Sequence, residues 1–380
     1  MAVADSVQNV GTDNIQAGAV TNAKLANDSI TINGSDTALG TSVTVDVPTT
    51  RNLIINGAME VAQRGTSHTT AAQTYLLDRF YTYCAASGKT ISQTSNAPDG
   101  FRKSIKLQRD NGSSATNPVY FSQPCESSAC VGFAGQTITL SFYARKGADF
   151  SPTNDFINVN VVSGTGTDQS LMGGLTGAVN VIGTIDQAIT ADWVRYTFTS
   201  GSAVPTNSNQ LVFQILHSPT GTAGANDWYE ITGIQIEIGS SATDFVHESF
   251  ADTLFKCKRF YQKSFDYETA PFHTGYVAAH SEAGGGTGSV TTATEYVTVT
   301  RYERGLRVDP TIVYYRAQGG GLSDGEWAYW DGADNLDTSG LPSAATTQIV
   351  LRTAVPFASG GKTTGRAGIT QGNYTADSEL

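Results

Sequence analysis

The sequence contains few charged residues and few cysteines. Charged side chains make up 15 % of its 380 residues, against about 25 % in an average soluble domain. Four cysteines in a chain of this length do not form a disulfide framework, and no Cys-x-x-Cys pair is present to hold a structural zinc. Cys125 and Cys130 lie five positions apart, so we expect either two reduced thiols or a bridge that closes a small loop.

Basic residues and long apolar runs are also scarce. The chain has 23 Lys and Arg against 34 Asp and Glu, a formal net charge of −11. An acidic surface argues against nucleic acids and against anionic membranes as partners. No apolar run approaches the roughly 18 residues that cross a bilayer. The first residues have neither a basic region nor an apolar core, so we expect no signal peptide and assembly in a cytoplasm.

The abundant residue types favour β-structure. Gly accounts for 40 residues, and the chain is rich in Ser, Thr, Asn, Val and Ile, which suits short strands separated by turns. A hydrophobic content of 39 % is enough to build cores. We predict an all-β protein with an extended N-terminal docking segment (1–50), a jelly-roll β-sandwich (51–246), a short helix–strand junction (247–268) and a small C-terminal β-sandwich (269–380).

The N-terminal segment carries a regular row of apolar residues. Val10, Ile15, Val20, Leu25 and Ile30 recur every five residues, which is neither the helical period nor the strand period. A single chain cannot bury such a row against itself. The segment is therefore either a disordered tail or a short-stepped repeat that buries the row against symmetry mates or a docking partner.

Strand-like runs separated by Gly, Asn and Asp turns fill the two larger parts. An alternating run at 42–47 precedes them. In the jelly roll we expect strands at 52–55, 104–107, 137–143, 157–162, 194–199, 211–216 and 228–238. In the C-terminal part we expect them at 276–279, 296–302, 311–315, 326–330 and 347–352. Residues 368–380 read as a loosely held end.

The junction between these parts shows a helix signal. Ser249 and Asp252 resemble a capping box, and Phe250 and Cys257 follow at helical spacing. Acidic residues come first and basic residues last, an order that complements the helix dipole. Alternation from residue 261 onwards favours a strand after the helix.

Motifs for catalysis are absent or wrongly spaced. The five histidines form neither a metalloprotease motif nor a Ser-His-Asp order, and the glycine-rich stretches lack the spacing of nucleotide-binding loops. Glycoside hydrolysis needs two carboxyl groups that face each other across the substrate, whereas acids clustered on one loop lie side by side. We therefore expect no enzyme.

The strongest binding candidate is the segment Gly-Glu-Trp-Ala-Tyr-Trp-Asp-Gly at 325–332, which places three aromatic rings among acids. Sugars present C–H faces that stack on such rings, and their hydroxyls hydrogen-bond to carboxylates. The predicted ligand-binding residues are Trp327, Tyr329, Trp330, Asp324, Glu326 and Asp331. The alternative is that these rings fill the core of a small domain or a trimer interface.

Several stretches between residues 52 and 315 resemble one protein family. They include Asn-Leu-Ile-Ile-Asn-Gly-Ala-Met-Glu-Val-Ala-Gln-Arg-Gly-Thr at 52–66, Leu-Asp-Arg-Phe at 77–80 and Cys-Lys-Arg-Phe-Tyr-Gln-Lys-Ser at 257–264. Further such stretches lie at 141–147, 192–196, 223–239 and 307–312. Together with the five-residue steps of the N-terminus, they resemble the modular tail-fibre and receptor-binding proteins of tailed bacteriophages.

The resemblance implies a homotrimeric virion fibre that is assembled in the host cytoplasm and needs no cofactor. Residues 1–50 would attach it to the virion tail, through a baseplate or adaptor protein. Residues 269–380 would contact a host-surface polysaccharide or an outer-membrane protein. A capsid head fibre or decoration protein and a polysaccharide depolymerase are the alternatives.

A structural calcium is a further implication of this resemblance. Jelly rolls that resemble carbohydrate-binding modules often hold calcium near their first and last strands, where Glu60 and Asp227 lie in this sequence. Because Ca²⁺ takes six to eight oxygen ligands, two carboxylates are only a beginning. The alternative is that both are solvated or paired with Arg64 or Arg79.

Overall fold

The computed structural model describes residues 29–32, 35–39, 41, 52–69, 74–271, 288–292, 295–315, 325, 327–330, 337–338, 343–356 and 367–379. The expected strands at 42–47 and 276–279, and all of the apolar row except Ile30, lie outside the described residues. The chain divides into two compact units, Met1–Thr49 and Thr50–Leu380.

The described part of the first unit is a small hairpin. Strand β1 (Ser29–Ile32) pairs antiparallel with β2 (Ser35–Ala38). The hydroxyl of Thr31 donates a hydrogen bond of 2.8 Å to the carboxylate of Asp36. Ile30, the last member of the apolar row, is 52 % exposed.

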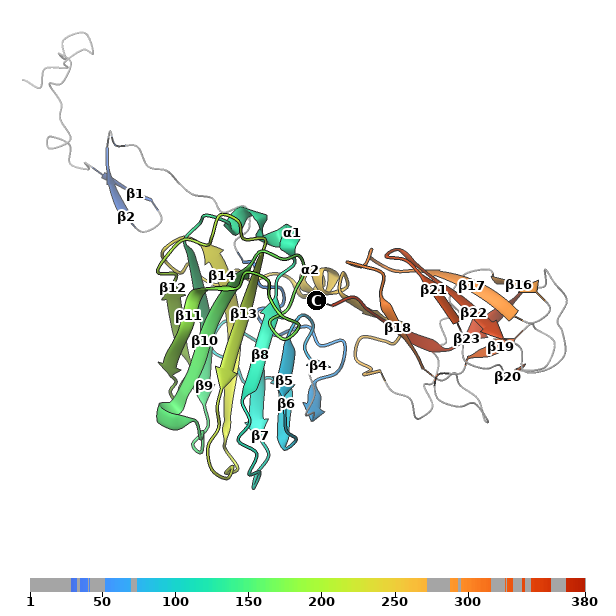
Figure 1. The fold of residues 1–380 in the computed structure, drawn as a ribbon, viewed down its shortest axis with the longest axis horizontal. Coiled ribbons are helices and arrows are strands. Elements are labelled where there is room, and N and C mark those ends of the chain that lie inside the picture. The colour runs from blue at the N-terminus through green and yellow to red at the C-terminus, as the bar shows by residue number, and fades with distance from the viewer. Residues whose placement is uncertain are drawn as a thin grey trace, which may run out of the picture. The chain divides into compact units, whose positions relative to one another are not determined.

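The second unit contains a sandwich of two six-stranded antiparallel sheets, which confirms the predicted all-β jelly roll (Figure 1). The first sheet has the order β11-β10-β13-β8-β5-β4 and the second has the order β12-β9-β14-β7-β6-β3. The first sheet contains β4 (Thr74–Tyr75), β5 (Tyr81–Cys84), β8 (Val119–Pro124), β10 (Phe156–Gly164), β11 (Val179–Ala188) and β13 (Gln210–His217). The second contains β3 (Ser67–Thr69), β6 (Lys89–Thr94), β7 (Ser104–Arg109), β9 (Ile138–Lys146), β12 (Val194–Thr199) and β14 (Trp228–Ile238).

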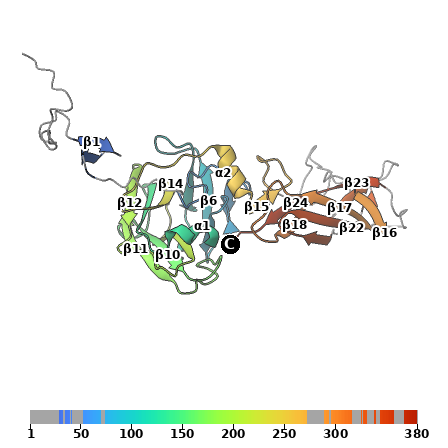
Figure 2. The same cartoon turned by 90° about the horizontal axis from the view of Figure 1, so that it is seen from above.

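The core of the sandwich lies between these two layers (Figure 2). Alternation along β9 shows how the sequence builds it, because successive side chains of a strand point to opposite faces. Ile138, Leu140, Phe142 and Ala144 all belong to the core and are fully buried. Complete burial of a large apolar side chain contributes roughly 1.5–3 kcal/mol, so this single strand anchors much of the second sheet.

The junction has the predicted helix and strand. Helix α2 (Phe250–Cys257) begins after Ser249, whose hydroxyl oxygen accepts a hydrogen bond of 3.1 Å from the backbone N–H of Asp252. Strand β15 (Tyr261–Lys263) follows. A shorter helix, α1 (Ser127–Cys130), lies after β8. Among the described residues, no helix is long and apolar enough to span a bilayer.

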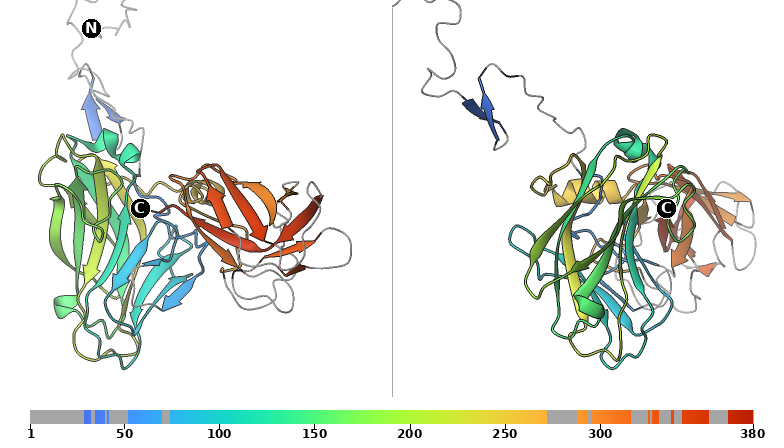
Figure 3. Two further views of the ribbon diagram at one scale, coloured as in Figure 1. Left: turned by 45° about the vertical axis from the view of Figure 1, so that its right-hand side comes forward. Right: turned by 60° about the vertical axis from the view of Figure 1, so that its left-hand side comes forward.

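The C-terminal part adds a three-stranded sheet of order β15-β24-β18 and a seven-stranded sheet of order β20-β19-β23-β16-β17-β22-β21 (Figure 3). Their strands are β16 (Gly288–Thr292), β17 (Glu295–Arg301), β18 (Thr311–Tyr315), β19 (Ala328–Trp330), β20 (Asp337–Thr338), β21 (Ser343–Thr346), β22 (Val350–Pro356), β23 (Ala367–Gln371) and β24 (Asn373–Asp377).

The expectation of a loosely held C-terminal end was wrong. Strand β24 is the central strand of its sheet, and Tyr374 and Ala376 belong to a second core cluster. Tyr374 and Ala376 are the two apolar residues that alternate in this strand. Two residues are too few for the sequence to indicate a buried strand.

Candidate ligand-binding cleft

Residues 52–66, the first stretch that carries the family resemblance, form a loop that is held by hydrogen bonds. Residues 52–55 were expected as a strand, but residues 52–66 have no strand, and Asn56 and Met59 adopt positive φ angles of 62° and 59°. The Asn56 amide donates to the carbonyl oxygens of Val61 (2.9 Å) and Asp78 (3.1 Å), and its oxygen accepts from the Val61 N–H (2.9 Å). Asn56 therefore fixes the conformation of this loop through its side-chain hydrogen bonds.

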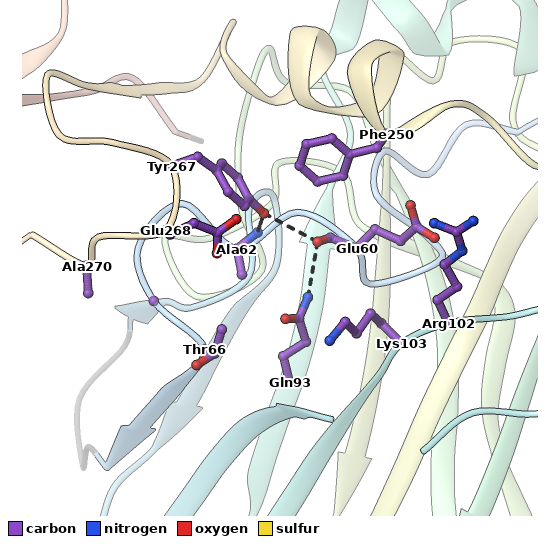
Figure 4. A pocket seen from close by; sticks show the side chains of 11 residues that line it. Glu60, Ala62, Thr66, Gln93, Arg102, Lys103, Phe250, Tyr267, Glu268 and Ala270 are labelled. Atoms are coloured by element: carbon purple, nitrogen blue, oxygen red, sulfur yellow. Dashed lines mark hydrogen bonds between the residues drawn. The ribbon is translucent and has the colours of Figure 1, made fainter. Parts of the chain in front are cut away.

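This loop forms one wall of a cleft of about 490 Å³. The turn between β6 and β7, the start of α2 and the turn after β15 complete it (Figure 4). The lining residues are Glu60, Ala62, Gly65, Thr66, Gln93, Arg102, Lys103, Phe250, Tyr267, Glu268 and Ala270.

Tyr267 ties the two sides of the cleft together. Its hydroxyl accepts a hydrogen bond of 2.8 Å from the Ala62 N–H and donates to the Glu60 carbonyl oxygen at 3.4 Å. Burial raises the pKa of Tyr267 to about 12, so the phenol keeps its proton at neutral pH. The Tyr267 ring meets Phe250 edge to face at a centroid distance of 5.2 Å. Phe250 is 41 % exposed, and its ring therefore remains available to a ligand.

The turn that carries Tyr267 is held by Lys263. The Lys263 ammonium donates to the carbonyl oxygens of Tyr267 (2.8 Å) and Thr269 (2.7 Å). Burial lowers the pKa of Lys263 to about 8, although Asp78, Glu268 and Asp266 act in the opposite direction. On the opposite wall, the Gln93 amide donates to the carbonyl oxygens of Met59 (2.6 Å) and Glu60 (3.1 Å).

Charges of both signs line the cleft. Arg102 and Lys103 are the basic residues, and Glu60 and Glu268 are the acidic ones. Among the described residues, none of these four side chains forms an ion pair.

Of the residues predicted for ligand binding, the described ones, Trp327, Tyr329 and Trp330, do not line this cleft. Trp327 is only 3 % exposed, donates to the Asn373 carbonyl oxygen at 3.2 Å and meets Tyr314 edge to face. This ring packs in the second core cluster, which was the alternative expected from the sequence. Tyr329 and Trp330 belong to β19. The other predicted positions, Asp324, Glu326 and Asp331, lie outside the described residues.

Glu60 and Asp227 do not share a site. The N–H of Ile234 donates to Gly57, close to Glu60, whereas Asp227 lies seven residues before Ile234, just ahead of β14. Seven residues of strand span roughly 23 Å, which places the two carboxylates too far apart to ligate one calcium ion. Asp227 instead pairs with Arg109 at 2.8 Å and accepts from the Ser151 N–H at 3.0 Å. Within the described residues, no three His, Cys, Asp or Glu side chains gather as metal ligands.

A buried ionic cluster joins the motif residues to the last strand. Arg79, 1 % exposed, pairs with Glu379 and donates to the Pro124 carbonyl oxygen at 2.7 Å. Burial alone would lower the pKa of Arg79, but the Glu379 carboxylate together with Tyr75 and Cys125 raises this pKa above its usual value. Arg64 pairs with Asp377 at 3.0 Å and with Glu379 at 3.3 Å. In Figure 1 the C-terminus accordingly lies beside the sandwich.

All four cysteines are free and buried. A hydrogen bond with Cys130, together with burial, raises the pKa of the Cys125 thiol. In this structure the pair is therefore two reduced thiols in contact.

No protein-family model and no curated protein matches the sequence. Among solved structures, the enzymatically active domain of bacteriophage CBA120 tailspike protein 4 is 12 % identical with a TM-score of 0.32, and the match covers 50 % of this chain and 21 % of that chain. The CBM22-1 xylan-binding domain from Paenibacillus barcinonensis is 13 % identical with a TM-score of 0.27, covering 50 % and 96 %. A protein from Bacteroides thetaiotaomicron named as a sugar-binding protein is 12 % identical with a TM-score of 0.31, covering 50 % and 100 %. These likenesses concern the β-architecture and carry nothing about function.

Proposed function

We propose that this protein is a non-enzymatic virion protein of a tailed phage, a tail fibre that binds a host-surface glycan. The proposal of glycan binding rests on the cleft, which combines an exposed aromatic ring with charged side chains that form no ion pair among the described residues. The phage part rests on the sequence resemblance of residues 52–315.

The cleft offers the chemistry that a sugar needs. The apolar faces of Phe250 and Tyr267 suit the C–H face of a pyranose ring. The carboxylates of Glu60 and Glu268 present hydrogen-bond acceptors for hydroxyls. Its volume of about 490 Å³ lies within the range of roughly 300–1,000 Å³ for small-molecule sites, which suits one or two sugar units.

Oligomerisation would strengthen such a site. In the proposed arrangement residues 1–50 dock the chain on the virion tail, and three copies present three clefts to one surface. Linked sites raise the overall affinity through effective concentration, without new contacts. Native mass measurement should therefore show a trimer, and a monomer would remove the avidity argument.

The test of glycan binding uses two exposed phenylalanines of the same helix. Phe250 lines the cleft, whereas Phe255, 56 % exposed, contacts Arg304 instead. We expect Phe250→Ala to weaken binding to purified host-surface polysaccharide by roughly 2- to 13-fold, since an aromatic contact contributes about 0.5–1.5 kcal/mol. Phe255→Ala is the matched control and should bind as the wild type does. Equal binding by all three proteins would refute the cleft as the site.

Two further measurements separate the alternatives. Immunogold labelling of intact virions with antibody against residues 269–380 should mark the tail or its fibres. Gold over the capsid would instead indicate a head fibre or decoration protein. Release of reducing sugar from host capsule by the pure protein would indicate a depolymerase and would contradict the non-enzymatic proposal.

A further inference from the structure

A lysine and a cysteine meet inside the sandwich, away from the cleft. Cys84 ends β5 in the first sheet, and Lys89 begins β6 in the second sheet. The two residues are only 4 % and 3 % exposed. Their side chains therefore connect the two sheets within the protein interior.

The contact between them is unusually close. The Lys89 Nζ atom lies 2.7 Å from the Cys84 Sγ atom. This is shorter than the usual N–H···O distance of about 2.9 Å, although sulfur is a larger atom than oxygen. The two atoms are thus already at a separation that one bonded oxygen atom can span.

The described part of the chain offers the Lys89 side chain no second partner. Among the described residues, Lys89 forms no ion pair, and its only side-chain hydrogen bond is the one to Cys84. Arg109, the residue opposite Lys89 in the strand pair β6–β7, has a charge of the same sign and pairs with Asp227. Burial of an ammonium group is costly unless carboxylates or several carbonyl oxygens compensate it, and a thiol is a weak acceptor.

We propose that Lys89 and Cys84 are joined by a covalent N–O–S bridge when the protein is oxidised. The oxidant is dioxygen. The S–H bond and two N–H bonds of the ammonium are broken, and N–O and O–S bonds form around one oxygen atom. The second oxygen atom leaves as water, and one proton passes to solvent. Sulfur and nitrogen each lose two electrons, which together reduce dioxygen fully. The product is neutral, so the bridge also removes the uncompensated buried charge.

Peptide mapping of the full-length protein tests this proposal. After exposure to air, trypsin should fail to cleave after Lys89, because the modified amine is no longer a lysine side chain. Residues 80–102 should then appear as one peptide with a mass gain of about 14 Da, from one oxygen gained and two hydrogens lost. Reduction with dithiothreitol should restore cleavage into 80–89 and 90–102.

Two variants provide the controls. Cys84→Ser should abolish the mass gain and restore cleavage after Lys89, whereas Cys257→Ser should keep the bridge. Because Cys84→Ser is buried and could unfold the protein, the wild type is also measured alone, in air and under argon with reductant. The proposal is overturned if air-exposed, folded wild type is cleaved fully after Lys89 and its Cys84 thiol is alkylated after denaturation. A sulfinic acid on Cys84 without linkage would overturn it as well.

Discussion

His217 should make the stability of the sandwich depend on pH. Its side chain is buried between Tyr229, at a ring distance of 5.0 Å, and Phe150, at 6.1 Å. Its Nδ1 atom has no hydrogen-bond partner among the described residues. Burial, together with the positive charges of Lys89 and Arg109, lowers the pKa of His217 from 6.5 to about 3. In the folded protein this imidazole therefore stays neutral in mildly acidic solution.

The sign and size of the effect follow from proton linkage. Between pH 6.5 and pH 3 the unfolded chain binds a proton at this histidine and the folded chain does not, so the free energy of unfolding falls as the pH falls. With those two pKa values the loss between pH 7 and pH 5 is about 2 kcal/mol. Between pH 7 and pH 8 this histidine should contribute almost nothing.

The assay is urea unfolding followed by tryptophan fluorescence at pH 8, 7, 6 and 5. The wild type is compared with His217→Gln and His217→Phe, and only the difference in pH dependence is interpreted. This comparison cancels the contributions of other groups, including His68, whose pKa is also lowered by burial. If the variants lose as much stability as the wild type between pH 7 and pH 5, the reasoning fails.

Three other substitutions test the packing. Glu379→Gln keeps the shape of the side chain but leaves Arg79 buried without its carboxylate. We expect the free energy of unfolding, measured with urea, to fall by about 3–5 kcal/mol. A fall of less than about 1 kcal/mol would mean that the ionic cluster does not stabilise the fold. Gly57→Ala would place a Cβ atom 2.2 Å from the Ile234 carbonyl oxygen, so we expect a lower melting temperature, and unchanged melting would contradict the loop geometry. Trp327→Ala should destabilise the C-terminal core by about 3–5 kcal/mol, measured in the same way, whereas a stable variant would show that this ring is not a core residue.

Much of the sandwich could be predicted from the sequence, and particular strands show why. The stretches 194–199 and 228–238 were predicted with the bounds of β12 and β14, because alternating or continuous apolar residues mark them clearly. Strands β3, β4, β5, β6, β8 and β11 were missed. Strand β11 shows one reason: it is largely exposed, so its sequence carries no strong alternation. The error at 52–55 came from apolar residues that serve a loop rather than a sheet.

The cleft could not be predicted, because its walls come from distant parts of the chain. Glu60, Arg102, Phe250 and Tyr267 lie on four separate segments, and only the packing of α2 and the turn after β15 against the loop 52–66 brings them together. The aromatic cluster at 327–330 offered a stronger local signal. For Trp327 that signal reflected a core, since composition does not distinguish a buried ring from a binding ring.

The pairing of β18 with β24 has a consequence for how this protein can vary. Tyr315 lies opposite Asn373, so the chain leaves the three-stranded sheet and returns to it at neighbouring positions. The stretch 316–372 is therefore an insertion with a closed base, and Arg79 and Arg64 hold the returning strand through Glu379 and Asp377. Insertions with adjacent ends can change in length and content with little effect on the host domain. One unchanged sandwich could thus present many different C-terminal modules.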